Sequence, residues 1–328
     1  MSRPLENRED TNFLRSIAII LIVNTHLKKF YPITYLATGG IIGNSIFFML
    51  SSFGLCLSEK KRPATLLEYY EKRVVRIYPS VWFSLLLLQL PLLIYTGKAA
   101  DCGLLPFLGN FFYPPFWFIQ AIMVFYFMGY FIIKRYSDKK FALAGSLLFL
   151  AYVFLYFKFT DLSRYSMGHL SASVIFFYLG IFIFGIFLGN RSDKIRYEGA
   201  GDVIGIIILL AIIYGNKYLM LKNMDFRAQF IEQLACFPLV YLLLKVSRSP
   251  LILKLAALPV LSKIILWTSA CTLEIYMVHI TLRDQFGMSN YSFPLNVLIF
   301  LSLTFVFVCL IGQPALRIRM NWDNSRLT

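Results

Sequence analysis

The chain alternates between long apolar segments and short polar loops. Ten segments of about 20 residues are each long enough to cross the roughly 30 Å hydrocarbon core of a bilayer as a helix. This pattern predicts an all-α polytopic transmembrane helix bundle, with one membrane domain over residues 1–328 and no soluble extra domain. The ten predicted spans are residues 13–30, 39–57, 77–96, 115–134, 141–158, 171–190, 201–219, 228–246, 262–282 and 294–313.

Basic residues gather in alternate loops, as the positive-inside rule requires. This asymmetry predicts that these loops and both termini are cytoplasmic. One predicted outer loop, with Lys217, Lys222 and Arg227, is also basic, which makes the seventh and eighth spans the weakest. The cytoplasmic set comprises Lys60, Lys61, Arg62, Lys72, Arg73, Arg76, Lys134, Arg135, Lys139, Lys140, Arg191, Lys194, Arg196, Lys245, Arg248, Lys254, Arg317, Arg319 and Arg326.

Composition supports a membrane protein and excludes other classes. The chain has 328 residues, 58% of them hydrophobic, which exceeds what a soluble domain of this size needs. The net charge of +15 follows from the basic loops, so no nucleic-acid partner is expected. The five cysteines have no paired spacing, which indicates neither a disulfide framework nor a zinc site, and no metal is expected.

The first apolar segment carries an ionisable residue near each end, Arg15 and His26. They are eleven positions apart, which places them on one helix face within roughly 20° and about 16 Å apart along the axis. Such groups in a bilayer are functional candidates. Equally, Arg15 could anchor the helix at the interface, and His26 could be an interfacial histidine beside Lys28 and Lys29.

The second segment holds small residues at Gly43, Ser51, Ser52 and Gly54. Small residues let membrane helices approach closely, and we favour this packing role. A catalytic Ser51 is the alternative, although no histidine lies near it in sequence and an unaided serine is a weak nucleophile.

Two arginines, Arg73 and Arg76, precede the third segment in a predicted loop that runs from residue 58 to 76. If that stretch is helical, they share a face because they are three residues apart. Two guanidinium groups on one face can bind phosphate oxygens in bidentate fashion. Alone, the pair also fits a basic flank that contacts anionic lipid.

Further polar groups lie inside the fourth and ninth segments. Tyr126 and Gln120 are polar side chains at depth in the fourth. In the ninth, Tyr276 and His279 share a face, and His279 lies at about the level of His26. Glu274 is off that face and is expected to pair with a base on another helix, because a buried carboxylate needs a partner.

These patterns together resemble the acyltransferase-3 family of bacterial integral-membrane acyltransferases, over nearly the whole chain. Two departures are visible: Ser52 stands where the family usually has a glycine, and Gly312-Gln313-Pro314 stands where its last span often ends in glutamate, one residue and then proline. The segments that carry the resemblance are Arg15 with His26, residues 39–51, residues 72–79 and residues 275–279.

The resemblance implies transfer of an acyl group, most often acetyl, from cytoplasmic acyl-coenzyme A to a hydroxyl of a cell-surface polysaccharide or its lipid-linked precursor. It implies a location in the bacterial cytoplasmic (inner) membrane. Arg73, Arg76 and Arg15 would meet the coenzyme A phosphates, and His26 would act as general base. Supporting roles are implied for Ser51, Tyr126, Glu274, Tyr276 and His279.

Two rival functions use the same residues. A transporter or flippase of a glycan or lipid would line its pathway with Arg15, Glu274 and His279. Such proteins tend to show internal repeats and matching broken helices, and the sequence shows neither. A structural partner in a polysaccharide-synthesis complex is the third possibility.

Overall fold

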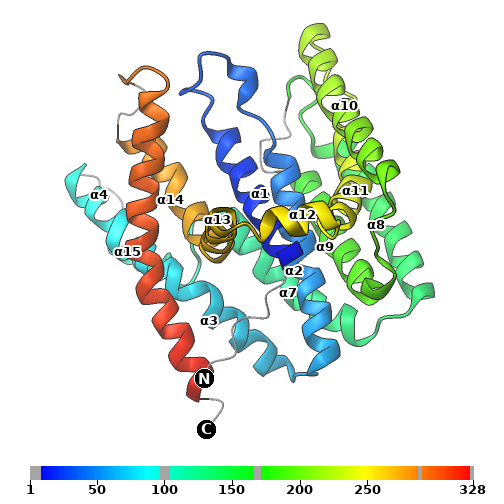
Figure 1. The fold of residues 1–328 in the computed structure, drawn as a ribbon, viewed down its shortest axis with the longest axis horizontal. Coiled ribbons are helices and arrows are strands. Elements are labelled where there is room, and N and C mark those ends of the chain that lie inside the picture. Colours follow the sequence, from blue (N-terminus) through cyan, green and yellow to red (C-terminus); the bar gives the residue numbers. More distant parts are fainter. Residues whose placement is uncertain (1–8, 97–103, 166–170, 287–289, 326–328) are drawn as a thin grey trace.

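A computed structural model describes residues 9–96, 104–165, 171–286 and 290–325 of the chain. The described part consists of helices and loops, without a strand, which confirms the all-α prediction (Figure 1). Its α-helices are α1 (Glu9–His26), α2 (Gly40–Lys61), α3 (Leu66–Ser84), α4 (Leu90–Tyr95), α6 (Leu104–Gly109), α7 (Trp117–Lys134), α8 (Asp138–Phe159), α9 (Ala172–Asn190), α10 (Ala200–Asn223), α11 (Gln229–Val246), α12 (Pro250–Ala256), α13 (Pro259–Ala270), α14 (Thr272–Gln285) and α15 (Leu295–Ser325).

Seven helical segments of the described chain are long and apolar enough to cross a membrane, or eight if the bent pair α12 and α13 is one span. The seven correspond to the predicted second, third, fourth, sixth, seventh, eighth and tenth spans. In the region of the predicted fifth span, the apolar helix is shorter, Gly145–Phe159. The count of ten therefore stays a prediction, as does the orientation of the termini.

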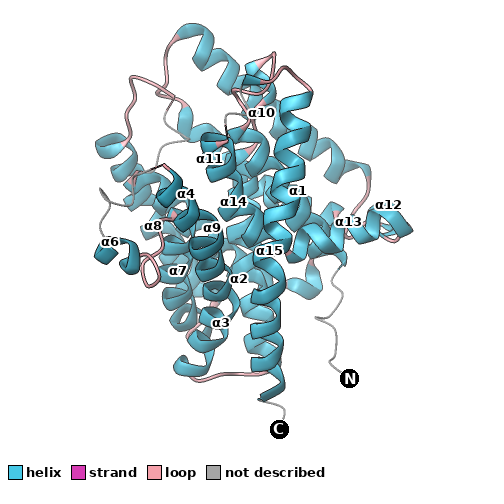
Figure 2. Cartoon of the chain, turned by 90° about the vertical axis from the view of Figure 1, so that its left-hand side faces the viewer, coloured by secondary structure: helices cyan, strands magenta, loops and turns pink. Residues whose placement is uncertain are grey.

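α1 lies in the middle of the bundle and contacts α2, α13 and α14. In Figure 1, α14 and α15 lie on one side of α1, and α8, α10 and α11 lie on the other. Figure 2 shows α14 beside α1 from a second direction. α3 also packs on both α14 and α15. Helices from the beginning and the end of the chain thus meet, and they carry most of the predicted site residues.

The loop that the sequence predicted over residues 58–76 is shorter in the structure. Its predicted end at residue 76 was wrong, because α3 begins at Leu66. A capping box starts the helix: the Thr65 hydroxyl accepts from the Glu68 amide and the Glu68 carboxylate accepts from the Thr65 amide. This exchange satisfies two amides at the helix start. Arg73 and Arg76 are therefore helical and share a face. Pro79 lies within α3, and one π-helical turn, Leu85–Gln89, follows it.

The predicted ninth span is broken in the structure. α13 ends at Ala270 and α14 begins at Thr272, while α12 and α13 meet at 89°. Pro259 opens α13, and the residue before a proline is disfavoured in a helix. Leu258 accordingly has an extended backbone, with ψ of 134°. This bend lies before the predicted span, and the separate break at Cys271 makes α14 a short helix of its own.

Small residues bring α2 into contact with α9, as the packing interpretation of the second span expects. A Cβ added to Gly185 would lie 2.0 Å from the Ser52 Oγ, and one added to Gly189 would lie 2.7 Å from the Cys56 Cβ. The two glycines form a small-xxx-small pattern on α9. A Cβ on Gly54 would meet no atom within 4 Å, so the expectation was wrong for that residue.

The basic outer loop of the sequence is largely helix. α10 continues to Asn223, and Lys217 on it turns toward the bundle. Its Nζ lies 3.4 Å from the Thr38 Oγ1 and 5.1 Å from the centre of the Tyr165 ring. The Tyr165 hydroxyl donates at 2.6 Å to the buried Glu232 carboxylate. Lys217 is therefore held against the bundle, whereas Lys222 and Arg227, the other two basic residues of the predicted outer loop, are exposed.

Candidate functional site

The end of α1 and the middle of α14 bring two histidines together. The ring centres of His26 and His279 are 5.1 Å apart. His26 is half-buried, whereas His279 is fully buried. This confirms the prediction that the two histidines lie at about the same level, and it joins them into one site.

The hydrogen bonding of His279 fixes where its proton resides. The Nδ1 nitrogen lies 3.1 Å from the Ile275 carbonyl oxygen, one turn earlier on α14. Because a carbonyl can only accept, Nδ1 carries the proton. The Nε2 nitrogen then holds a free lone pair. It is buried and has no hydrogen-bond partner among the described residues, so it can accept a proton.

In His26 the proton is on the other ring nitrogen, because Arg283 contacts its Nδ1. The Arg283 Nη1 lies 3.2 Å from the His26 Nδ1, and a guanidinium can only donate. The His26 Nε2 therefore carries the proton. Asp284 holds the arginine through its Nε at 2.7 Å and its Nη2 at 2.5 Å. Sequence reasoning missed Arg283, although it follows His279 by four residues and so shares its helix face.

An aromatic wall closes the other side of His279. The Tyr276 ring centre lies 5.8 Å from that of His279, as their shared face predicts. Two rings from the segment at the start of α7 pack on Tyr276, Phe118 at 5.4 Å and Phe116 at 6.4 Å. These rings contribute to the complete burial of His279.

Arg15 lies on the same helix as His26, as predicted, but is not brought to the histidines. Both residues belong to α1, and Arg15 lies about three turns before His26. Its neighbour Ser16 donates at 3.0 Å to the Ile265 carbonyl of α13. Arg15 therefore belongs to the half of the bundle nearer to α13.

Arg73 is stacked between two tyrosines. Its guanidinium carbon lies 5.0 Å from the centre of the Tyr69 ring and 5.8 Å from that of Tyr126 on α7. Its Nε is buried without a hydrogen-bond partner in the described chain. Arg76, on the same face, is exposed. Tyr126 thus helps to position Arg73. We refer to Arg73 and Arg76 together as the arginine site.

Glu274 pairs with a base on another helix, as expected. Its Oε1 lies 3.1 Å from the Arg319 Nη2 of α15. The Ser80 hydroxyl of α3 donates to the same carboxylate oxygen and accepts from Arg319. The contact links α3, α14 and α15. Sequence reasoning placed Arg319 only among the cytoplasmic charges and missed this role.

Ser51 is not brought into the site. It is half-buried on α2, and no histidine within the described residues hydrogen bonds to it. Its neighbour Ser52 donates to the Met49 carbonyl at 3.0 Å and packs on α9. Both observations agree with a packing role for this segment.

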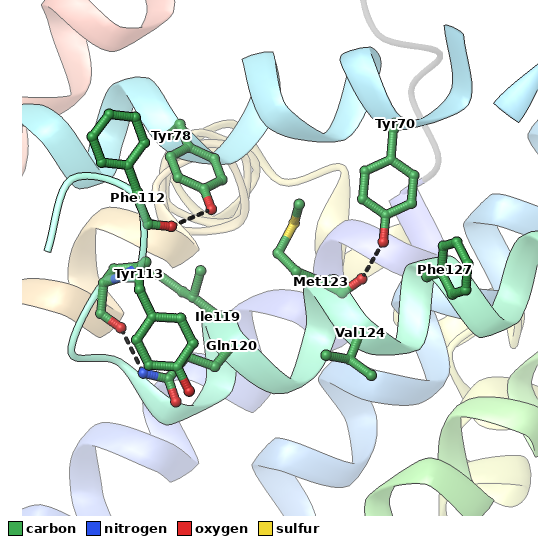
Figure 3. A pocket seen from close by; sticks show the side chains of 10 residues that line it. Tyr70, Tyr78, Phe112, Tyr113, Ile119, Gln120, Met123, Val124 and Phe127 are labelled. Atoms are coloured by element: carbon green, nitrogen blue, oxygen red, sulfur yellow. Dashed lines mark hydrogen bonds between the residues drawn. The ribbon is translucent and has the colours of Figure 1, made fainter. Parts of the chain in front are cut away.

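A pocket of about 370 Å³ lies between α3 and the segment that enters α7 (Figure 3). Tyr70 and Tyr78 reach across it from α3. Tyr70 donates at 2.7 Å to the Met123 carbonyl, and Tyr78 donates at 2.9 Å to the Phe112 carbonyl. Gln120 donates to the Pro114 carbonyl at 2.9 Å, which satisfies its amide at depth. The pocket contains neither histidine and neither arginine of the candidate site.

The described residues offer no group of three histidine, cysteine, aspartate or glutamate side chains that could hold a metal ion. The chemistry available at the two centres is instead imidazole acid–base chemistry and guanidinium binding of anions.

This fold and these two centres define an integral membrane protein with a pair of adjacent histidines and an arginine site. Residues 9–312, nearly the whole chain, match the model of the acyltransferase-3 family, described as an acyltransferase domain. The chain therefore belongs to that family and is a membrane acyltransferase. Searches of the curated proteins and of the solved structures return no match.

Proposed function

We propose that the protein transfers an acetyl group from cytoplasmic acetyl-coenzyme A to a hydroxyl of a cell-surface polysaccharide or its lipid-linked precursor. The observation that carries this proposal is the close approach of His26 and His279, with complementary proton positions, inside the matched domain. We place the protein in the bacterial inner membrane, where coenzyme A is available on one side and surface glycan precursors are assembled.

The histidine pair suits both halves of the reaction. In the first step, the pair accepts the proton of the acceptor hydroxyl while the oxygen attacks the thioester carbonyl carbon. In the second step, the pair gives the proton to the sulfur as the carbon–sulfur bond breaks, so coenzyme A leaves as a free thiol. His26 is the member nearer to the acceptor because it is half-buried, whereas His279 is fully buried. We therefore assign His26 as the general base, with His279 as its partner. The lone pair of His26 is on Nδ1, so the acceptor hydroxyl takes the place of the Arg283 hydrogen bond there and gives its proton to this nitrogen.

The arginines suit the donor. Coenzyme A carries several phosphate groups, and planar guanidinium groups bind phosphate oxygens in bidentate fashion. Arg73 has an unpartnered buried Nε, and Arg76 is exposed on the same helix face. Arg15 lies on α1 about three turns before His26, and we assign it to the donor path. An Arg15→Ala variant is accordingly expected to need more acyl donor for half-maximal rate.

Acceptor-dependent release of coenzyme A tests the proposal. Purified protein in lipid nanodiscs is supplied with acetyl-coenzyme A and surface glycan from a deletion strain, and the free thiol is followed with a chromogenic reagent. We expect thiol release only when both substrates are present, together with new acetyl esters on the glycan by mass spectrometry. A transporter or a structural partner would release no thiol, and that result would overturn the proposal.

A further inference from the structure

Arg319 adds a third guanidinium to the face of α3 that carries Arg73 and Arg76. Ser80, which donates to Glu274 and accepts from Arg319, follows Arg76 by four residues and Arg73 by seven. These spacings place all three α3 residues within about 60° of one another around the helix. Along the axis, Ser80 is about 6 Å from Arg76 and about 10 Å from Arg73. The end of α15 therefore delivers its arginine to one end of the arginine row.

The pair between Arg319 and Glu274 leaves hydrogen-bonding capacity unused. One nitrogen contacts one carboxylate oxygen, at 3.1 Å. The Arg319 Nε and the Glu274 Oε2 are both buried without a partner in the described part of the chain. A bidentate pair would have satisfied both atoms. The guanidinium is therefore only partly engaged by its own carboxylate.

The two partners differ in access. The side chain of Arg319 is 20% exposed, whereas that of Glu274 is 2% exposed. Arg319 is therefore the partner that a ligand can reach from outside, whereas the carboxylate is buried. Nearby, the Trp322 indole donates at 3.1 Å to the Glu71 carboxylate, which ties the same end of α15 to α3. The position of Arg319 over α3 is thus maintained by two separate contacts.

We propose that Arg319 is the third cation of the donor site, binding a phosphate group of the acyl donor, and that Glu274 competes with this phosphate for it. The ligand class is a molecule with several phosphate groups, because three guanidinium groups in a row need more negative charge than one carboxylate supplies. In the donor-free protein, Glu274 compensates the charge of Arg319. The inference rests on the proposed use of coenzyme A as donor.

Direct binding of coenzyme A to the purified protein in nanodiscs, by calorimetry, tests the proposal. Arg319→Gln should weaken binding by about 10- to 100-fold, the value of one or two hydrogen bonds to a charged group. Arg319→Lys, which keeps the charge and loses the planar fork, should fall between. The matched control is Arg317→Gln on the same helix, because Arg317 is exposed and points about 160° away from Arg319.

Glu274→Gln separates a competing role from a purely structural one. If Glu274 competes with phosphate, its neutralisation should tighten coenzyme A binding several-fold, even if the unliganded protein melts at a lower temperature. Unchanged or weaker binding in Glu274→Gln overturns the competition, and wild-type affinity in Arg319→Gln overturns the third cation. Wild-type protein that binds no coenzyme A overturns the proposed donor and this inference together, so the two failures are distinguishable.

Discussion

The imidazole rings of His26 and His279 lie 5.1 Å apart, although one belongs to α1 and the other to α14. Their backbone and arginine contacts give the two Nε2 nitrogens opposite proton content: the His279 Nε2 holds a free lone pair, and the His26 Nε2 carries a proton. A pair with this arrangement can take up and return one proton without a net change, which is what acyl transfer to a hydroxyl requires.

Replacement of His26 separates catalysis from packing. Glutamine can keep hydrogen bonds but cannot act as a base near neutral pH. We expect His26→Gln to insert and to bind acetyl-coenzyme A normally, while its acyl transfer falls by roughly 10²–10⁴-fold. Turnover per folded molecule is the measurement. Near-normal turnover in the purified variant would exclude His26 as the base, even within an acyltransferase.

The donor site is tested by the double substitution Arg73→Ala and Arg76→Ala. Loss of two guanidinium groups should weaken acetyl-coenzyme A binding by at least about 10-fold, because hydrogen bonds to charged groups are each worth roughly 1.5–3 kcal/mol. Single lysine replacements should also impair binding, since a bidentate fork is lost. Arg62→Ala, an exposed cation before α3, is the control. Equal affinity in all variants would leave the pair as a basic flank.

Orientation in the membrane follows from loop charge and is tested by labelling. In a protein freed of its own cysteines, a cysteine at Asp161 should react with an impermeant thiol reagent from outside the cell. A cysteine at Arg62 should react only after the membrane is opened. Both positions are exposed, whereas native Cys102 lies outside the described residues. The reverse labelling pattern would place the arginine site on the outer side and exclude a cytoplasmic donor.

A buried lysine supports α10 and α11. The Lys245 Nζ lies 2.6 Å from both Asp202 and Glu198, and its side chain is 4% exposed. Lys245→Met leaves the Asp202 carboxylate without its cation, which should lower the free energy of unfolding by about 1–3 kcal/mol. Lys254→Met, at an exposed position on α12, should change it little. Thermal unfolding in detergent measures both, and equal melting temperatures would show that the ion pair contributes nothing.

Hydropathy predicted the helical class and most of the helices, because burial in lipid demands long apolar runs. It failed where local polar chemistry decides the boundary. The capping box of Thr65 and Glu68 starts α3 at Leu66, ten residues before the predicted end of the loop at residue 76. Pro259 sets the bend that precedes α13. Both signals are present in the sequence, as a capping box and a proline, but they are masked when segments are judged by hydropathy alone.

The predicted site was recovered unevenly. His26, Tyr276 and His279 could be grouped from helix periodicity and approximate depth, and the structure brings them together. Arg319 was missed because its partners come from other helices, which no spacing rule along one helix reveals. Arg283 shares a face with His279, but its contact with His26 on α1 could not be predicted from that spacing. For Glu274, the cost of an unpaired buried charge predicted a partner, but could not say which helix supplies it.

The glycines of α9 have a mechanical consequence. At Gly185 and Gly189, α9 leaves no room for even a methyl group against Ser52 and Cys56 of α2. Sliding either helix by one turn would drive larger side chains into that seam, so its register is locked and the two helices move as one rigid body. A Cβ added to Gly43 of α2 would likewise lie 2.6 Å from the Ala18 carbonyl oxygen of α1. The same argument joins α1 to this unit, so a motion that admits an acceptor to the histidines is expected on the α14 side of a fixed α1–α2–α9 frame.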